Sequence, residues 1–417
     1  MRHDGTAVFC ALSRKRAGGM LTPEKEIFSP LNVIGLMSGT SADGIDASLV
    51  SIKGHGPRMI VKLLAFASST YPRKLQAHIL QICESGTGPE VCDLNVTLGE
   101  RFAATALKLI RLSGLTNHDI HLIGSHGQTL YHHSRAPHRS TLQIGEPAII
   151  AERTGVTTVA DFRPRDMAAG GEGAPLTPYA HHILFQHKTR SRLIVNLGGI
   201  CNVTYLPSTM TGGTIAAFDV GPGNMMINSA ITHITKGKAR QDTNGSTAAK
   251  GRINQALLTA LSKHPFLKRR PPKSTGREEF GNAYVQRLMR DARRCKMQNE
   301  DFVATVTAFT AQAANTSQRF LKGTVDEVIL AGGGTKNHTL VKEFRTAFAP
   351  ISVNTAEAYE WNSKTIEATA FAIMAYQTIH GTPNNLPSVT GADRLVVMGK
   401  ILPGRSFRLQ TRKAVEP

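Results

Sequence analysis

Residues 33–50 read Val33-Ile34-Gly35-Leu36-Met37-Ser38-Gly39-Thr40-Ser41-Ala42-Asp43-Gly44-Ile45-Asp46-Ala47-Ser48-Leu49-Val50. Both ends are apolar and β-prone, and glycines, hydroxyl residues and aspartates lie between them. This pattern predicts a β-hairpin whose tip presents backbone N–H groups and hydroxyls. Gly39 and Gly44 permit positive φ or close backbone approach, as binding of a nucleotide triphosphate requires. An ordinary tight hairpin is the alternative that composition alone leaves open.

The length and composition predict a two-domain globular protein. At 417 residues the chain exceeds the size at which single cores stop growing. No apolar run approaches the roughly 20 residues that span a bilayer, so we expect no membrane segment. The five cysteines are odd in number and lack CxxC spacing, which predicts a reducing cytoplasm and no zinc site.

The net charge of +19 allows nucleic acid, an anionic membrane or acidic small molecules as partners. The basic clusters Arg14-Lys15-Arg16 and Lys268-Arg269-Arg270 are short and are not interleaved with aromatic residues. No zinc-finger or RNP-type motif accompanies them. We therefore interpret the excess as a solvated basic surface and predict no nucleic-acid partner.

The opening pattern occurs a second time along the chain. Residues 192–206 again read as strand, turn and strand, with Gly198 and Gly199 at the turn. A third strand runs into Asp219-Val220-Gly221-Pro222-Gly223-Asn224, and a later apolar strand ends in Gly332-Gly333-Gly334.

Two copies of one pattern predict an α/β fold with two domains flanking a cleft. We expect an N-terminal domain over residues 31–190 and a C-terminal domain over residues 191–417. Residues 1–30 lack periodicity and are predicted to be a disordered extension.

Asp219 is a candidate catalytic carboxylate because it follows an apolar strand and precedes Gly-Pro-Gly. A helix N-cap or turn aspartate is the alternative. Arg165 and Asp166, with His126, Gln128 and Thr129 on another turn, supply the hydrogen-bonding groups that a sugar acid needs, since an arginine fork pairs well with a carboxylate. The alternative here is an internal salt bridge that joins Arg163 or Arg165 to Asp161 or Asp166.

Several motifs resemble those of the anhydro-N-acetylmuramic acid kinases, bacterial sugar kinases of the hexokinase–actin–Hsp70 superfamily. They are GLMSGTSADGID (35–46), IGSHGQT (123–129), VADFRPRDMAAGGEGAPLTP (159–178), NLGGICNV (196–203), FDVGPGN (218–224), KSTGREEF (273–280) and the glycine triplet. The resemblance covers nearly the whole chain after Leu31. Glu172 stands where we expect glutamine in the family pattern.

The resemblance implies two duplicated RNase H-like domains and ATP-dependent conversion of 1,6-anhydro-N-acetylmuramic acid to N-acetylmuramic acid 6-phosphate, in cell-wall recycling. Asp219 would be the general base, and Gln128, Thr129, Arg165, Asp166 and Glu367 would contact the sugar. The nucleotide would be bound by Gly39, Thr40, Ser41, Ala42, Asp43, Gly44, Ile45, Asp46, Gly198, Gly199, Gly221, Gly223, Asn224, Gly332, Gly333 and Gly334. Mg²⁺ is implied without assignable ligands, and the family is typically homodimeric.

Three other functions stay open at this point. A kinase on the same fold could phosphorylate a free hydroxyl without ring opening, or an actin-like ATP-dependent clamp could bind ATP without sugar turnover. Nucleic-acid binding driven by the net charge is the third.

Overall fold

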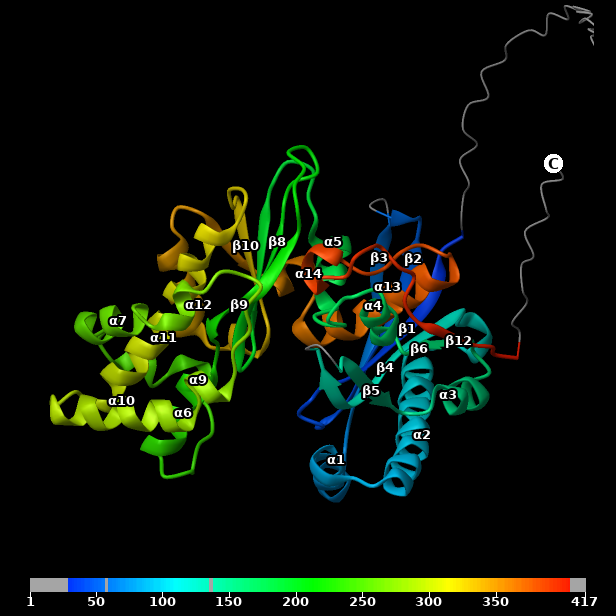
Figure 1. Ribbon diagram of the computed structural model, residues 1–417, viewed down its shortest axis with the longest axis horizontal. Coiled ribbons are helices and arrows are strands. Elements are labelled where there is room, and N and C mark those ends of the chain that lie inside the picture. The colour runs from blue at the N-terminus through cyan, green and yellow to red at the C-terminus, as the bar shows by residue number, and fades with distance from the viewer. Residues whose placement is uncertain (1–28, 57–58, 135–137, 406–417) are drawn as a thin grey trace, which may run out of the picture.

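The computed structural model describes residues 29–56, 59–134 and 138–405. The predicted extension over residues 1–30 lies outside the described residues, apart from Ser29 and Pro30. Two β-sheets with their own helices lie side by side along the long axis of the molecule (Figure 1). The α/β fold with two sheets confirms the predicted fold class.

The first sheet has the strand order β12-β6-β4-β1-β2-β3, and β5 pairs with β4 beside this path. Pairs β1–β2 and β2–β3 are antiparallel, whereas β4 runs parallel to both β1 and β6. The strands are β1 (Leu31–Ser38), β2 (Gly44–Lys53), β3 (Ile60–Thr70), β4 (Leu122–His133), β5 (Ser140–Ile144), β6 (Thr158–Ala160) and β12 (Lys400–Leu402).

The second sheet has the order β11-β10-β7-β8-β9 and repeats the topology of the first. Its first three strands in the chain form an antiparallel meander, and β10 runs parallel to β7 and β11. The strands are β7 (Arg192–Leu197), β8 (Ile200–Leu206), β9 (Ala216–Pro222), β10 (Glu327–Ala331) and β11 (Ser352–Thr355). The repeat that the sequence predicts is therefore a structural duplication.

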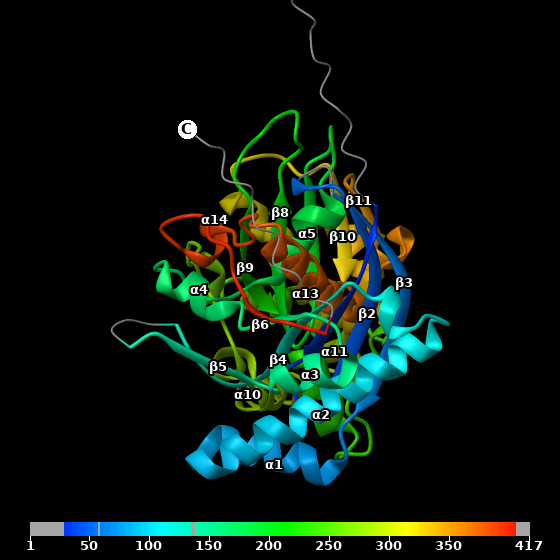
Figure 2. The ribbon, with the colours of Figure 1, turned by 90° about the vertical axis from the view of Figure 1, so that its right-hand side faces the viewer.

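The helices divide between the two sheets, and Figure 2 shows α2, α3 and α13 around the first. Those of the first body are α1 (Arg73–Ser85), α2 (Gly88–Leu112), α3 (Pro147–Thr154), α4 (Arg163–Ala168), α5 (Thr177–Phe185), α13 (Ser363–Ile379) and α14 (Pro387–Thr390). Those of the second are α6 (Met225–Ile234), α7 (Gln255–Ser262), α8 (Pro265–Lys268), α9 (Arg277–Phe280), α10 (Asn282–Arg294), α11 (Asn299–Thr316) and α12 (His338–Phe348). Among the described residues, no helix is long and apolar enough to cross a bilayer.

The first sheet is covered on both faces because its central strands are apolar on both sides. Val33 and Leu122 belong to the core cluster that includes α13, whereas Ile34 and Ile123 belong to the cluster that includes α2. Successive residues of a strand point to opposite faces, so α13 and α2 lie on opposite sides of the sheet.

Helix α13 packs directly on the backbone of β1 and β4. Gly35 and Gly124 are register partners on these parallel strands. A Cβ atom at Gly35 would lie 1.9 Å from the carbonyl oxygen of Ala368, and one at Gly124 would lie 2.0 Å from that of Phe371. Only glycine permits this approach of helix to sheet.

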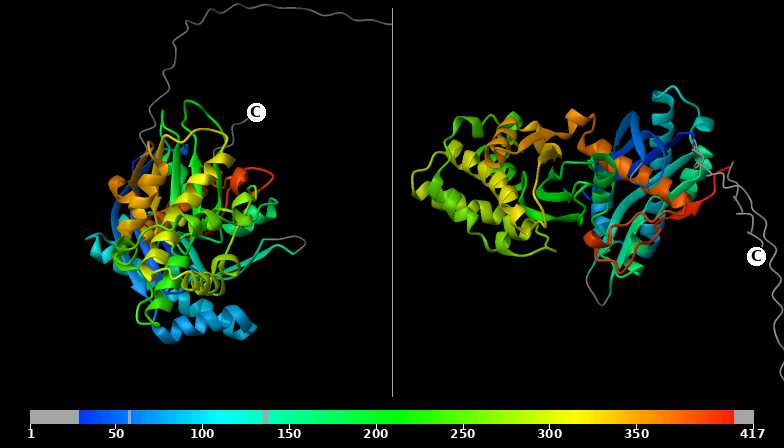
Figure 3. Two further views of the ribbon diagram at one scale, coloured as in Figure 1. Left: turned by 90° about the vertical axis from the view of Figure 1, so that its left-hand side faces the viewer. Right: turned by 90° about the horizontal axis from the view of Figure 1, so that it is seen from above.

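The chain crosses between the two bodies twice, first after α5 and again through the 3₁₀ helix η7 (Ala356–Tyr359) into α13. Seen from above, the bodies meet in the middle of the molecule (Figure 3). Because α13 packs on the first sheet and β12 pairs with β6, residues beyond about 362 join the first body. The predicted boundary of 191–417 for the second domain differs from this arrangement, since an almost wholly buried helix does not show in its sequence which sheet it covers.

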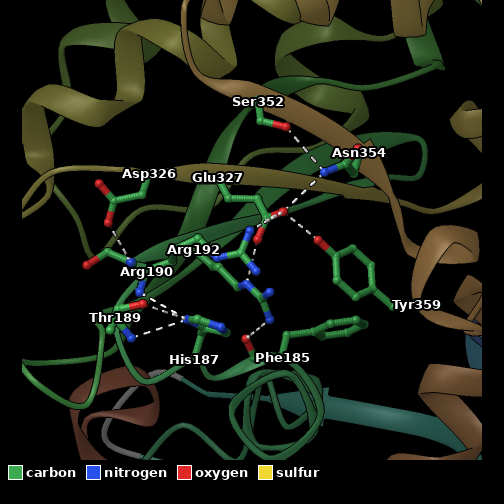
Figure 4. Close-up of polar contacts among 11 residues, drawn as sticks. Phe185, His187, Thr189, Arg190, Arg192, Asp326, Glu327, Ser352, Asn354 and Tyr359 are labelled. Carbon is green, nitrogen blue, oxygen red and sulfur yellow. Dashed lines mark hydrogen bonds and ion pairs between the residues drawn. The ribbon is translucent and has the colours of Figure 1, made fainter.

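Both crossings are joined to the start of β10 by one buried carboxylate (Figure 4). Glu327 pairs with Arg192 at 2.7 Å and accepts a hydrogen bond from the Tyr359 hydroxyl on the returning segment. Arg192 also donates to the carbonyl oxygen of Phe185, the last residue of α5, at 2.8 Å. Burial alone would raise the pKa of Glu327, but the Tyr359 hydrogen bond and the charges of Arg192 and Arg190 lower it below the ordinary value.

We predict that Gly124→Ala destabilises the protein, because α13 must move away from the sheet to admit the methyl group. Overpacking of this kind costs about 1–3 kcal/mol, measured as the free energy of unfolding in urea. Gly88→Ala is the matched control, since a Cβ atom there meets no atom within 4 Å. Equal stability of the two variants would contradict the close packing described here.

Candidate active site

A cavity of about 690 Å³ lies between the two bodies. The first body lines it with residues of β4, the segment after α4, α5 and α13, and the second body with residues of β7, β8, β9 and the segment between α8 and α9. The polar and charged lining residues are His132, Ser134, Glu172, Thr177, His181, Asn196, Asn202, Thr204, Asp219, Arg269, Arg270, Lys273, Ser274, Ser363 and Glu367.

Asp219 lies inside β9, not beyond its end, and faces the cavity. The register of β8 and β9 shifts between Cys201 and Asn202, which leaves Val220 as a bulge directly after the aspartate. Bulges of this kind redirect side chains next to active sites. The helix N-cap alternative is wrong, because Asn224 is the N-cap of α6.

Two backbone contacts fix the Asp219 residue. The backbone N–H of Thr275 donates to Oδ2 at 3.0 Å, and the N–H of Asp219 donates to the carbonyl oxygen of Lys273 at 3.2 Å. Burial raises the pKa of Asp219 to about 6, and the Thr275 hydrogen bond and the Lys273 charge oppose this rise. A carboxylate with this pKa is ionised at neutral pH and still basic enough to accept a proton.

Asn196 and Asn202 share a row with Asp219 across three strands. Asn196 pairs with Asn202 between β7 and β8, and Asn202 pairs with Asp219 between β8 and β9. All three residues line the cavity. The sequence analysis singled out neither asparagine, although two asparagines within otherwise apolar strands were a usable signal.

Glu367 reaches the same cavity from α13. Burial raises its pKa to about 7, and the charge of Asp46 adds to this rise while Lys364 opposes it. Asp46 itself forms an ion pair of 3.0 Å with Lys364. The cavity thus holds two carboxyl groups that are both less acidic than usual.

The predicted phosphate hairpin is the turn between β1 and β2, and Gln128 supports it from β4. Ser38 Oγ lies 2.7 Å from Gln128 Oε1, and Gln128 Nε2 donates to the carbonyl oxygen of Gly39 at 3.1 Å. Gln128 is only 1% exposed, so it holds the hairpin and does not line the cavity. Thr40, Ser41 and Asp43 are exposed at the tip, whereas Ala42 and Ile45 are core residues.

The three glycine segments predicted in the second domain lie close together. Gly223 and Asn224 donate backbone hydrogen bonds to Gly199 and Gly198 at 2.9 and 2.8 Å. A Cβ atom at Gly334 would lie 3.0 Å from Nδ2 of Asn224. Four glycines thus allow three chain segments to meet at the end of the second sheet.

The other predicted sugar contacts lie outside the cavity lining. Arg165 is exposed on α4, and Thr129 accepts a hydrogen bond from Gln143 at 3.3 Å. Asp166 is fully buried and accepts three hydrogen bonds at 2.8–3.0 Å, from the backbone of Gly173 and the side chains of Asn385 and Thr390.

The internal salt bridge considered for Arg163 is also wrong. Its guanidinium donates to His126 Nε2 at 3.2 Å and to the carbonyl oxygen of Gly173 at 2.8 Å, while Asp161 pairs with Lys400. Burial and the Arg163 charge lower the pKa of His126 to about 3, so this histidine is a neutral acceptor.

In the ranges that the structure describes, no group of three or more His, Cys, Asp or Glu side chains could hold a metal ion.

A family model described as anhydro-N-acetylmuramic acid kinase matches residues 31–404. The anhydro-N-acetylmuramic acid kinase of Caldanaerobacter subterraneus subsp. tengcongensis is 48% identical over 380 residues, covering 88% of this chain and 96% of that protein. The protein of the same name from Bacillus cereus strain G9842 is 42% identical over 379 residues, covering 88% of this chain and 98% of that protein. Component A of the (R)-2-hydroxyglutaryl-CoA dehydratase of Acidaminococcus fermentans, a solved structure, covers 84% of this chain and 99% of its own at 11% identity and a TM-score of 0.43.

We predict that Asp219→Asn stabilises the fold at pH 8. The folded-state pKa of Asp219 is raised from 3.8 to about 6, so its contribution to stability is present below pH 4 and is lost as the pH rises through 6. One pKa unit corresponds to about 1.4 kcal/mol, so we expect a gain of about 3 kcal/mol in the free energy of unfolding at pH 8.

The same variant should differ little from the parent protein at pH 3, where both side chains are neutral. Urea unfolding at the two pH values measures this, with the exposed Glu84→Gln as the control for charge removal. Destabilisation at pH 8 would show that Asp219 has a structural role.

Proposed function

The chain belongs to the anhydro-N-acetylmuramic acid kinase family, and from this premise we propose that it opens 1,6-anhydro-N-acetylmuramic acid with water and phosphorylates O6. The products are N-acetylmuramic acid 6-phosphate and ADP, and the reaction serves peptidoglycan recycling. The observation that carries this proposal is Asp219, a buried carboxylate with a pKa near 6 in the cavity between the two bodies.

Asp219 acts as the general base in this reaction. It takes a proton from water as the water oxygen bonds to the anomeric carbon and the bond from that carbon to O6 breaks. O6 then bonds to the γ-phosphorus of ATP, and ADP leaves. No separate acid is needed for the departing oxygen, because phosphorus captures it.

The neighbours of Asp219 orient the reactants. Asn196 and Asn202 lie in its row and supply amide groups that hold the attacking water or a sugar hydroxyl. Glu367 faces them from α13, and its pKa near 7 lets it donate or accept a hydrogen bond at neutral pH.

ATP is bound by the hairpin tip of the first body and the glycine segments of the second. The tip of residues 39–46 exposes hydroxyls and backbone to the phosphates. Gly198, Gly199, Gly221, Gly223 and Asn224 bind from the other side, and Gly332–Gly334 admit the adenosine. The mutual contacts of these three segments support this assignment.

Thr129 and Arg165 lie outside the present cavity lining. Their contact with the sugar therefore requires the two bodies to close on it. Gln128 and Asp166 act through the segments that they hold, the hairpin and the loop at Gly173. Residues 31–190 and 363–405 form the sugar-contacting domain and the residues between them the catalytic one. The proposal includes use of Mg²⁺, a homodimeric state and a cytoplasmic location, which the family resemblance leads us to expect.

Release of ADP tests the reaction. We expect release with the anhydro sugar and none with ring-opened N-acetylmuramic acid. Turnover in H₂¹⁸O should place label at the anomeric position, before slow exchange. Phosphorylation without label would identify a kinase that acts on a free hydroxyl, and ATP binding without turnover would identify a clamp.

We predict that Asp219→Asn lowers kcat by at least about 10²–10⁴-fold, the usual contribution of general-base catalysis. The amide cannot accept the proton, so ring opening and phosphoryl transfer should fall together. Binding of ATP and sugar, measured by calorimetry, should persist because the two side chains have nearly the same shape. A stable variant with near-normal kcat would refute the mechanism.

We predict that Arg165→Ala raises the KM for the sugar far more than the KM for ATP, since an arginine fork on the lactyl carboxylate is lost. Arg111→Ala, a change of the same charge at the exposed end of α2, is the control. Equal effects on both substrates would show that Arg165 does not bind the sugar.

A further inference from the structure

The segment between α8 and α9 contains the start of the KSTGREEF motif, which the mechanism above leaves without a role. Residues 269–275 run along the cavity, and five of them line it: Arg269, Arg270, Pro272, Lys273 and Ser274. This segment also supplies both backbone groups that contact Asp219.

One glutamate fastens the segment at both ends. Glu279 on α9 forms an ion pair with Arg269 at the beginning of the segment, at 2.5 Å. It also accepts a hydrogen bond of 2.6 Å from the Thr275 hydroxyl at the end. Residues 270–274 therefore form a loop that Glu279 closes at Arg269 and Thr275. The conformation of this loop depends on the contacts that its own residues make.

Lys273 holds the middle of the loop, because its ammonium group lies among three aromatic rings. The Nζ atom is 4.6 Å from the ring centre of Phe266, 4.8 Å from that of Phe320 and 6.0 Å from that of Phe218. It also donates to the carbonyl oxygen of Phe266 at 3.4 Å. An ammonium within about 6 Å of a ring face is attracted by the ring quadrupole, more strongly when it is partly desolvated.

The caged ammonium also contributes to the field at Asp219. Burial lowers the pKa of Lys273 to about 8, and the charges of Arg319 and Arg269 add to this, while Asp219 and Glu279 oppose it. In return, Lys273 lowers the pKa of Asp219. Burial and the charge of Asp219 raise the pKa of the neighbouring Cys201 thiol, which therefore stays neutral. Arg269, Arg270, Glu172, Glu367, His132 and His181 line the same cavity.

We propose that Lys273 is a positioning residue for the catalytic base: its aromatic cage fixes residues 273–275, whose backbone holds Asp219 in the orientation that accepts the proton of water. This inference rests on the assignment of Asp219 as the base. In this role Lys273 acts on Asp219 through the Thr275 N–H and through its charge.

Lys273→Met tests the proposal, because methionine fills the cage and removes the charge. We expect kcat to fall at least about tenfold, since small misplacements of catalytic groups cost up to about 10²-fold. The KM for ATP should stay within about twofold. The acidic limb of the pH profile of kcat/KM should move to higher pH, because Asp219 loses a neighbouring positive charge.

The controls separate positioning from a general structural effect. Lys273→Arg keeps a cation in the cage and should restore the acidic limb, and Lys268→Met makes the same charge change at an exposed position of α8 and should match the parent protein. Thr275→Pro removes the N–H donor and is the second variant should Lys273→Met not fold.

The outcomes also distinguish the two proposals. If Asp219→Asn is inactive while Lys273→Met keeps the parental kcat and pH profile, the positioning role is refuted and the base assignment stands. If Asp219→Asn is active, the base assignment itself fails. A fall in kcat with an unmoved acidic limb and no recovery in Lys273→Arg would show ordinary loss of packing and overturn the proposal.

Discussion

The contact between α13 and the paired glycines of β1 and β4 is the constraint on which the site depends. Gly35 and Gly124 let the helix backbone lie against the strands, and this places Glu367 at the cavity and Lys364 beside Asp46 of the β1–β2 hairpin. A helix held farther from the sheet by a single methyl group would move both side chains away. The sheet that supplies the hairpin therefore also positions the helix that lines the cavity together with Asp219.

The features of the fold that could be predicted from the sequence are those marked by a pattern of neighbouring residues. Glycines, hydroxyl residues and aspartates between two apolar runs identified the first hairpin, and its repetition identified the second sheet. Asp219 was recognisable because it follows an apolar run and precedes Gly-Pro-Gly, although the structure places it inside β9 and not beyond its end. These features depend on residues that are close together in the chain, so they can be predicted from the sequence alone.

The remaining features depend on contacts between distant residues. The hydrogen bond from Thr275 to Asp219 joins positions 56 residues apart through a backbone N–H, which no side-chain pattern reveals. Asp166 and Gln128 looked like ligand-binding residues, yet both are buried and hold loops. Helix α13 is buried on nearly every side, so its periodicity could not show that it returns to the first sheet.

The carboxylate of Glu327 links both connections between the two bodies to the start of β10. Both connections pass close to it, one through Arg192 and Phe185 and the other through Tyr359. Removing this carboxylate would leave the Arg192 guanidinium and the Tyr359 hydroxyl without their shared partner at the two places where the chain passes between the bodies.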